Sequence, residues 1–496
     1  MGYRSPRVDA DKAALGDAEK GNNSTVQPVG PDGPVAAAWD GPDDPRDPYN
    51  WTKTRKISIA LVISLSQLVC LMTTSIVAPA LPQIATDLHL GESKAQIAFS
   101  IFVLGQAFGP FVIAPLSEVF GRKPVWITFN LFYIFWNSLC PVGKSQAVLI
   151  IGRLLSGAGG SCGVILSGPI MADMFHQKDR GKSLAIASMF PYLGPALGPI
   201  VGGIVSQYVS WPWLFWVMSI FDAVVVAFGV VIVKETCKPV LLRRKTGHDK
   251  GGNAIDLSPS EDGLLSRMRA RLQRPLLLLG TRPIIQITAL VIGLGFGIYI
   301  LVLSFFATLF VDQYHQSTTD SSLQYIAIAL GSTLATQAGG QLMDAIFARL
   351  RDRLPEGSAL RETPPPEFRV PIMVIGALLS PIGLFWLGWS VQARAPWIMV
   401  DIGATIFVAG TFLASQAASA YLLDEFTVEA ASATAAARML SNLMGFTFPL
   451  FAPNLYDRLG YGWGNSLLAF VWIALVVPIP AILWYRGDRI RAIGRK

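Results

Sequence analysis

Two ionisable side chains lie inside long apolar stretches of this sequence. Arg153 interrupts QAVLIIGRLLSGAGGSCGVILSG, and Asp222 lies in WLFWVMSIFDAVVVAFGVVIV. A charged group at membrane depth is costly and is by default a functional candidate. We therefore take Arg153 and Asp222 as candidate proton-coupling residues. The alternatives are an arginine that reaches the outer surface and an aspartate that is only a hydrogen-bonded structural carboxyl.

Other patterns that could carry chemistry are weak. GAGGSCG at 157–163 lacks the Lys-Ser/Thr pair of a phosphate-binding loop. The four cysteines show neither metal-ligand spacing nor a disulfide framework. No nucleophile–base pair stands out. We expect no enzymatic activity, no cofactor and no metal.

The elements that hold Arg153 and Asp222 are predicted to be membrane-spanning helices. Of the 496 residues, 52% are hydrophobic and 15% are charged, whereas soluble proteins carry about 25% charged residues. Apolar runs of about 20 residues, enough to cross a bilayer as a helix, recur along the chain. We predict an all-α integral membrane protein with twelve spans, at 57–79, 95–115, 124–142, 147–172, 183–206, 213–233, 283–311, 323–345, 370–390, 396–422, 433–455 and 463–484.

Basic residues set the predicted orientation. With both termini in the cytoplasm, the outer loops hold only four of the 40 Lys and Arg residues, as the positive-inside rule requires. The net charge of +7 then reflects topology in a lipid bilayer, and we expect no nucleic-acid partner.

The spans fall into two halves around a charged linker. We predict a disordered cytoplasmic N-tail, an N-terminal six-helix half, a cytoplasmic linker, a C-terminal six-helix half and a cytoplasmic C-tail. The end of the linker, GLLSRMRARLQRPLLLL, is either a helix on the inner leaflet or a plain basic connection. The boundaries are 1–50, 51–234, 235–282, 283–485 and 486–496.

The loop between spans two and three reads APLSEVFGRKP. It resembles the loop signature of the major facilitator superfamily, except at Ala114 and Val119. The resemblance implies that Glu118 faces the start of span eleven and that the bases bridge a cytoplasmic gate; the alternative is a positive-inside turn. GGQLMDAIFAR, with Asp344, resembles a degenerate second copy. The candidate gate residues are Glu118, Gly121, Arg122 and Lys123.

Prolines and glycines recur every four residues in PYLGPALGPIVGG. A small-residue stripe permits close helix packing, and we predict that span five packs on span eight and span two on span eleven. The run also resembles the fifth-helix signature of proton-coupled antiporters in the superfamily; the alternative is a generic kinked helix. The signature residues are Gly194, Gly198, Pro199, Gly202 and Gly203.

Polar side chains near the middle of the spans are candidates for the substrate cavity, because several lie on helices that line it in the superfamily. The alternative is hydrogen bonding between helices. The loop after span four, ADMFHQKDRGKS, resembles a family pattern through Asp173, Arg180 and Gly181, which implies a structural tie. The cavity candidates are Gln67, Gln106, Tyr299, Gln337, Gln416 and Asn442.

Taken together, the motifs resemble the fungal twelve-span drug:proton antiporter branch of the superfamily. The resemblance includes DPYNW before the first span and ETCKPVLLRRK after the sixth. It implies a proton-coupled exporter of a drug, toxin or secondary metabolite, working by alternating access as a monomer in the plasma membrane, with a vacuolar or other endomembrane as the alternative. Protons and a small molecule are the expected partners. The rival functions are an organic acid or polyamine transporter, and an importer of the same superfamily.

Overall fold

The computed structural model describes residues 39–41, 44–175, 190–249, 264–355, 358, 361, 364–426 and 430–493. Every regular element among them is helical. Eight helical stretches in this part of the chain are long and apolar enough to cross a bilayer. One of them, Ser432–Ala492, contains the last two predicted spans. The third, fifth and eighth predicted spans correspond to helical stretches that are shorter or less apolar than these eight. Residues 183–189 of the fifth lie outside the described residues.

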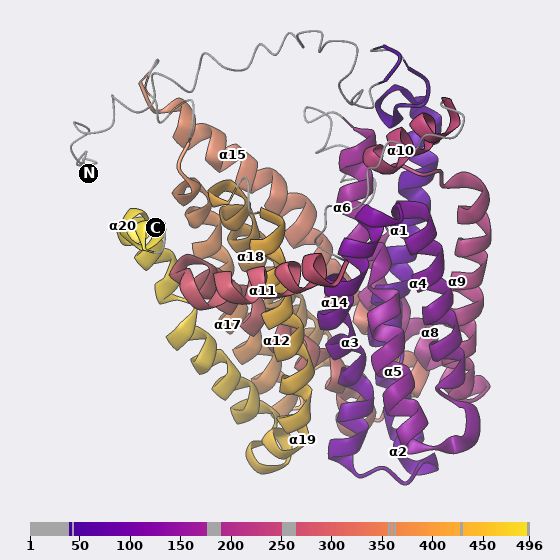
Figure 1. Cartoon of the computed structure of the whole chain (residues 1–496). Helices are drawn as coiled ribbons and strands as arrows, with labels where there is room; N and C mark the ends of the chain where they lie inside the picture. Colours follow the sequence, from indigo (N-terminus) through magenta and orange to yellow (C-terminus); the bar gives the residue numbers. More distant parts are fainter. Residues whose placement is uncertain are drawn as a thin grey trace.

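The first bundle stands together on one side of the molecule (Figure 1). It is entered through a short turn at Pro48–Asn50 (η1), and short turns at Ala78–Ala80 (η2), Val142–Lys144 (η3) and Pro191–Leu193 (η5) join its helices. Its helices are α1 (Lys53–Ser75), α2 (Leu81–Asp87), α3 (Glu92–Val119), α4 (Arg122–Leu139), α5 (Gln146–Gly160), α6 (Cys162–Met174), α8 (Gly194–Tyr208) and α9 (Pro212–Ile232).

The second bundle begins after two connecting helices, α10 (Lys238–Asp249) and α11 (Leu264–Thr281). Within it, α19 holds two helices that meet at Gly460, whose φ of 68° breaks the helical path. A π-helical turn at Leu334–Ala338 (η6) joins α14 to α15, and η7 (Pro366–Arg369) precedes α17. The helices are α12 (Pro283–Tyr314), α13 (Thr318–Leu323), α14 (Tyr325–Thr333), α15 (Gly339–Asp352), α17 (Val370–Gln392), α18 (Trp397–Glu425), α19 (Ala430–Leu475) and α20 (Pro478–Ala492).

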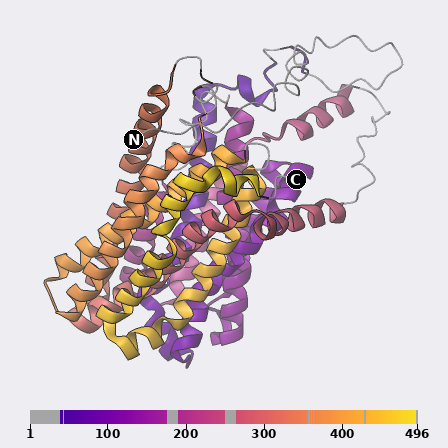
Figure 2. The ribbon, with the colours of Figure 1, turned by 90° about the vertical axis from the view of Figure 1, so that its left-hand side faces the viewer.

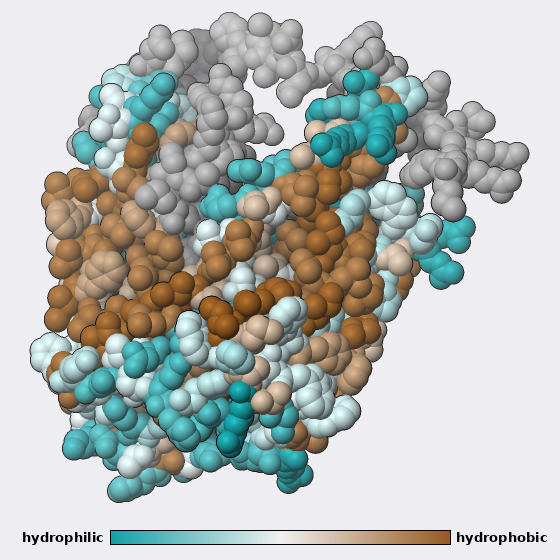
Figure 3. All heavy atoms as spheres, turned by 180° about the vertical axis from the view of Figure 1, so that it is seen from behind, coloured by the Kyte–Doolittle hydropathy of each residue, from teal (hydrophilic) through white to brown (hydrophobic). Residues whose placement is uncertain are grey.

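The outer surface has the pattern expected of a protein in lipid. A broad hydrophobic belt lies between hydrophilic ends (Figure 3). Large apolar side chains such as Phe228, Val231 and Trp463 are 62%, 79% and 58% exposed, an arrangement that water would not favour. Helix α11 runs across the long helices instead of along them (Figures 1 and 2) and contacts α3, α12 and α19.

The glycine stripe of α8 faces α1. A Cβ added at Gly198 would lie 2.7 Å from the carbonyl oxygen of Met72, and one at Gly202 would overlap that of Ile76. The predicted packing of span five on span eight is confirmed, since α8 contacts α13 and α14, but Gly194, Gly198 and Gly202 face α1 instead. A small-residue stripe signals close approach but does not name the partner helix.

The predicted packing of span two on span eleven is confirmed for the helices, but not through the glycines of span two. Gly105 and Gly109 of α3 lie against Leu154, Ala158 and Ser161 of the same half, so they do not form the α3 surface that meets span eleven. Helix α3 nevertheless contacts α19, where apolar side chains meet. Gly105 and Gly109 thus serve packing within the N-terminal half, whereas Gly203 of α8 lies against Thr318 and Ser322 of α13 in the other half.

Substitution of Gly202 tests how tightly α8 is packed. We expect Gly202→Ala to lower the free energy of unfolding by about 1–3 kcal/mol, the usual cost of overpacking, because the obstructing Ile76 carbonyl belongs to the backbone of α1 and cannot rotate away. Gly168→Ala on α6 is the matched control, since an added Cβ there meets nothing within 4 Å. Thermal unfolding of both purified variants measures the difference, and equal midpoints would contradict the close contact.

Candidate functional site

Arg153 is fully buried in the centre of the N-terminal bundle, at 0% exposure. Its Nε donates to the carbonyl of Ala98 (3.3 Å), Nη1 to that of Thr73 (3.1 Å) and Nη2 to that of Phe99 (3.1 Å). The guanidinium carbon lies 4.6 Å from the centre of the Phe102 ring. The burial excludes an arginine that extends to the outer surface.

These contacts join α5 to α1 and α3 through main-chain oxygens. Neutral carbonyls replace part of the hydration of a guanidinium but do not neutralise its charge. In the part of the chain that the structure describes, Arg153 forms no ion pair with a carboxylate. Arg153 is held by bonds that a helix shift would break.

Asp222 is buried on α9, at 0% exposure. Neither carboxyl oxygen has a hydrogen-bond partner among the described residues. Tyr133 of α4 is an electrostatic neighbour, and the hydroxyl of Tyr133 lies 2.7 Å from that of Thr73. Thr73 therefore links Arg153 to Tyr133, because its carbonyl accepts from Arg153 and its hydroxyl pairs with that of Tyr133.

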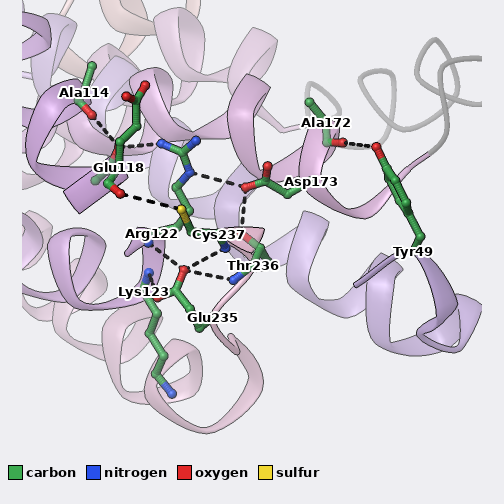
Figure 4. Close-up of polar contacts among 11 residues, drawn as sticks. Tyr49, Ala114, Glu118, Arg122, Lys123, Ala172, Asp173, Glu235, Thr236 and Cys237 are labelled. Carbon is green, nitrogen blue, oxygen red and sulfur yellow. Dashed lines mark hydrogen bonds and ion pairs between the residues drawn. The ribbon is translucent and has the colours of Figure 1, made fainter. Parts of the chain in front are cut away.

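The loop between α3 and α4 is the centre of a polar network (Figure 4). Arg122 pairs with Asp173 at the end of α6 (Nε to Oδ2, 3.3 Å) and donates from Nη1 to Ser117 (2.6 Å). Lys123 donates from Nζ to the carbonyl of Val230 (2.7 Å). Arg122 and Lys123 thus tie α4 to α6 and α9 within the N-terminal half. Arg180 and Gly181, the rest of the predicted tie to the next helix, lie outside the described residues.

Gly121 has a φ of 102°, which favours glycine, and its α-carbon approaches the carboxylate of Glu235. Glu118 has an exposed side chain, and its carbonyl accepts from the Cys237 thiol (3.9 Å). Burial raises the pKa of that thiol, so it remains a neutral donor. Glu118 was expected to face the start of span eleven; residues 427–429, which precede that span, lie outside the described residues.

Glu235 is the residue of this network that sequence analysis missed. Its carboxylate accepts from the backbone N–H groups of Arg122 (2.8 Å), Lys123 (3.3 Å), Thr236 (3.0 Å) and Cys237 (2.9 Å). A carboxylate at a helix N-terminus satisfies free donors and the positive end of the dipole. Glu235 therefore caps α4 from the far end of the half. The sequence feature that could have identified Glu235 is an acid in ETCKP just after the sixth predicted span.

We expect Glu235→Ala to destabilise the protein by about 2 kcal/mol or more, because a cap is lost and buried donors are left unpaired. Thermal unfolding in detergent measures the change. The control is Glu92→Ala, because Glu92 is an exposed acid in the first turn of α3. This substitution removes the same charge from the start of another helix. Equal shifts for the two variants would show that Glu235 acts only as a surface charge.

The C-terminal half contains an equivalent ion pair. Arg369, at the start of the ninth predicted span, binds Asp424 at the end of α18 (2.9 Å) and Asp344 of α15 (3.0 Å). Arg122 and Asp173 occupy the corresponding positions of the first half. The sequence hid this relation because Arg369 lies beyond the motif-like segment GGQLMDAIFAR. The shared ion pair agrees with an origin by duplication.

The cavity candidates of the N-terminal half bond to neighbouring helices. Gln67 donates to Ser167 (3.1 Å), and Gln106 donates to Thr74 (3.0 Å). Hydrogen bonding between helices was the alternative to a role in the substrate cavity, and both side chains form such bonds in this structure. Gln106 also lies one turn from Val103, the residue at which α3 meets Gly445 of α19, so its amide is near the contact between the halves.

Two cavity candidates of the C-terminal half have polar atoms to which the described part of the chain offers no hydrogen-bond partner. The buried Tyr299 hydroxyl and the Gln416 side-chain oxygen have no partner among the described residues. Tyr299 packs edge-on against Phe412 (5.3 Å between ring centres) and beside Phe296 (6.2 Å), two aromatic residues not singled out from the sequence. Gln337 is exposed. Asn442, half-buried, lies one turn from Gly445, where Phe296 and Val103 meet.

The chain matches the Major Facilitator Superfamily over residues 63–449. An uncharacterized transporter of Schizosaccharomyces pombe is 35% identical over 93% of this chain and 94% of its own length. The efflux pump vrtL of Penicillium aethiopicum is 34% identical over 93% of this chain and 91% of its own. The partially occluded inward-open xylose transporter XylE from E. coli, at 18% identity, shares the fold, with a TM-score of 0.60 over 86% of this chain and 98% of that one.

The chain therefore belongs to the major facilitator superfamily. It is a membrane transporter of small molecules and not an enzyme.

Proposed function

We propose that this protein is a proton-coupled efflux transporter that exports a small organic molecule by alternating access. It has twelve spans in two six-helix halves, both termini in the cytoplasm, and works as a monomer in the plasma membrane. The observation that carries the proposal is Arg153, a fully buried cation held by three main-chain carbonyls of α1 and α3. A buried charge with breakable partners supports a role in proton coupling.

A short segment of α1 connects the coupling candidates to the substrate candidates. Gln106 donates to Thr74, and Arg153 donates to the carbonyl of the preceding residue, Thr73. A substrate that binds the Gln106 amide competes with Thr74 for it. The released segment of α1 then shifts relative to α5 and changes the bonds of Arg153. Proton binding at Asp222, which interacts electrostatically with Tyr133, would act on Thr73 through the Tyr133 hydroxyl.

The proposed substrate is amphipathic, and neutral or weakly anionic. Tyr299, Phe296 and Phe412 offer aromatic surface, while Tyr299 and Gln416 offer polar atoms without a partner among the described residues. None of the central candidates is a carboxylate, which a polyamine would require. The relatives described as efflux pumps support export of a secondary metabolite.

Metabolite profiling of a deletion strain tests the direction of transport. We expect a compound to accumulate in the cells and to disappear from the medium, and re-expression to reverse both changes. The same compound should then enter proteoliposomes against its gradient when their interior is acidic, and a protonophore should stop this. Depletion from the deletion cells would instead indicate an importer, and indifference to the protonophore would refute proton coupling.

A further inference from the structure

A pocket of about 530 Å³, lined by neither Arg153 nor any cavity candidate, lies where the segment before α1 meets the start of α4, the end of α9 and the start of α10. Basic side chains dominate its wall. Five of them face a single acid, and Trp51 forms part of the apolar wall. The charged residues are Arg46, Arg55, Lys123, Lys234, Arg244 and Glu235.

The single acid can offset only one of these five positive charges. The Glu235 carboxylate already accepts four backbone N–H groups, so its oxygens are engaged at the cap of α4. Lys123 donates to the neutral carbonyl of Val230, which leaves its charge uncompensated. In the part of the chain that the structure describes, Arg55, Lys234 and Arg244 form no ion pair.

Basic residues just outside the pocket behave differently. Lys238 pairs with Asp47 (3.5 Å), and Lys245 pairs with Asp44 (3.6 Å). Carboxylates of the segment before α1 therefore pair with Lys238 and Lys245 outside the pocket, whereas Arg55, Lys234 and Arg244 within it have no ion pair among the described residues. A general excess of positive charge on one membrane face does not predict this division.

The pocket also lies at the level where a lipid headgroup would be. Helices α1 and α4 begin here, and α9 ends here, so the pocket marks one boundary of the hydrophobic belt. Trp51, a residue typical of this boundary, holds the Arg55 guanidinium 4.1 Å from its ring centre. Stacking fixes the plane of the guanidinium, so that its N–H groups are pre-oriented for an oxyanion.

We propose that this pocket binds the multiply phosphorylated headgroup of an anionic lipid in the cytoplasmic leaflet. The assignment rests on the cytoplasmic placement proposed above. Several separate cations around one cavity suit two or more phosphates better than one carboxylate. Because Lys123 and Glu235 belong to both the pocket and the α4 network, the bound headgroup would brace α4 against α9 and α10.

Binding can be measured on the full chain in phosphatidylcholine nanodiscs, titrated with dioctanoyl phosphatidylinositol 4,5-bisphosphate. We expect Arg55→Gln/Lys234→Gln/Arg244→Gln to weaken binding on the order of 100-fold, at roughly fivefold per basic residue near a membrane surface. The matched control is Arg349→Gln/Arg351→Gln/Arg353→Gln, which removes the same charge from α15 and the turn after it, at the same end of the molecule (Figure 1). The control should bind as the native chain does.

Equal weakening in both triple variants, or none in the pocket variant, would overturn the proposal. Soluble inositol 1,4,5-trisphosphate distinguishes the source of the phosphates: if it binds as tightly as the lipid, the ligand is a free phosphorylated metabolite and the lipid assignment fails. The exposed Lys234→Gln alone, with about a fivefold loss expected, replaces the triple variant if that variant unfolds. Both faces of a nanodisc are open, so these results depend neither on orientation nor on export.

Discussion

Arg153→Lys is expected to reduce proton-driven export about 100-fold while the protein remains folded. Lysine keeps the charge but concentrates its donors on one nitrogen, so it cannot hold the Thr73 carbonyl of α1 and the Ala98 and Phe99 carbonyls of α3 together. Losing two charge-assisted hydrogen bonds, each worth about 1.5–3 kcal/mol, accounts for a loss of that size or more. Initial rates in proteoliposomes under an imposed pH gradient measure it.

The control is the same substitution at an exposed site. Arg394→Lys changes an arginine of the predicted outer loop before α18 and should leave export at the native rate. A thermal midpoint within a few degrees of the native value would show that Arg153→Lys is folded. Native export by a folded Arg153→Lys protein would show that the fork geometry is irrelevant and that charge alone suffices.

Hydropathy identifies the helices of this chain because lipid leaves the backbone no other way to satisfy its polar groups. It also draws attention to Arg153 and Asp222, since charge is rare at that depth. The hydrogen-bond partners of these residues are harder to predict from the sequence. Arg153 binds main-chain carbonyls, which every residue possesses and which no sequence pattern marks.

Contacts between residues far apart in the chain also limit what the sequence can predict about the network around the α3–α4 loop. Glu235 caps α4 across 113 residues of chain, and nothing near Arg122 in the sequence points to it. The glycines of α8 show a related limit, because their spacing predicts a close neighbour while the identity of α1 follows only from the assembled bundle.

One turn of α1 unites these observations. Residues 72–75, together with Ile76 directly after the helix, present backbone to the glycines of α8, the Thr73 carbonyl to Arg153 and the Thr74 hydroxyl to Gln106. The three contacts lie on different sides of one helix, and each limits how α1 can move. A shift of this turn therefore alters the α8 packing, the bonds of Arg153 and the Gln106 amide together, which is the kind of linkage that alternating access requires.

Asp222→Asn is expected to separate substrate exchange from proton-driven export. Asp222 has no exposure and no hydrogen-bond partner among the described residues, an environment that strongly disfavours the charged carboxylate. Asparagine imitates the neutral acid in size but cannot release a proton. Exchange of labelled for unlabelled substrate across proteoliposomes should persist, whereas accumulation against a gradient should fall at least about tenfold, since one lost protonation step removes a driving force of that order.

Asp401→Asn is the matched control. Asp401 is also an acid within a span, but it is half-buried and lies near the start of α18. One of its carboxyl oxygens lacks a partner among the described residues. This variant should keep both activities. If Asp222→Asn accumulates substrate as the native protein does, Asp222 is a structural carboxyl and coupling belongs elsewhere. Loss of exchange and accumulation together would mean that Asp222 supports the helix arrangement and not the proton. Only selective loss of accumulation assigns the proton to this residue, because exchange requires every conformational step of the cycle except proton release.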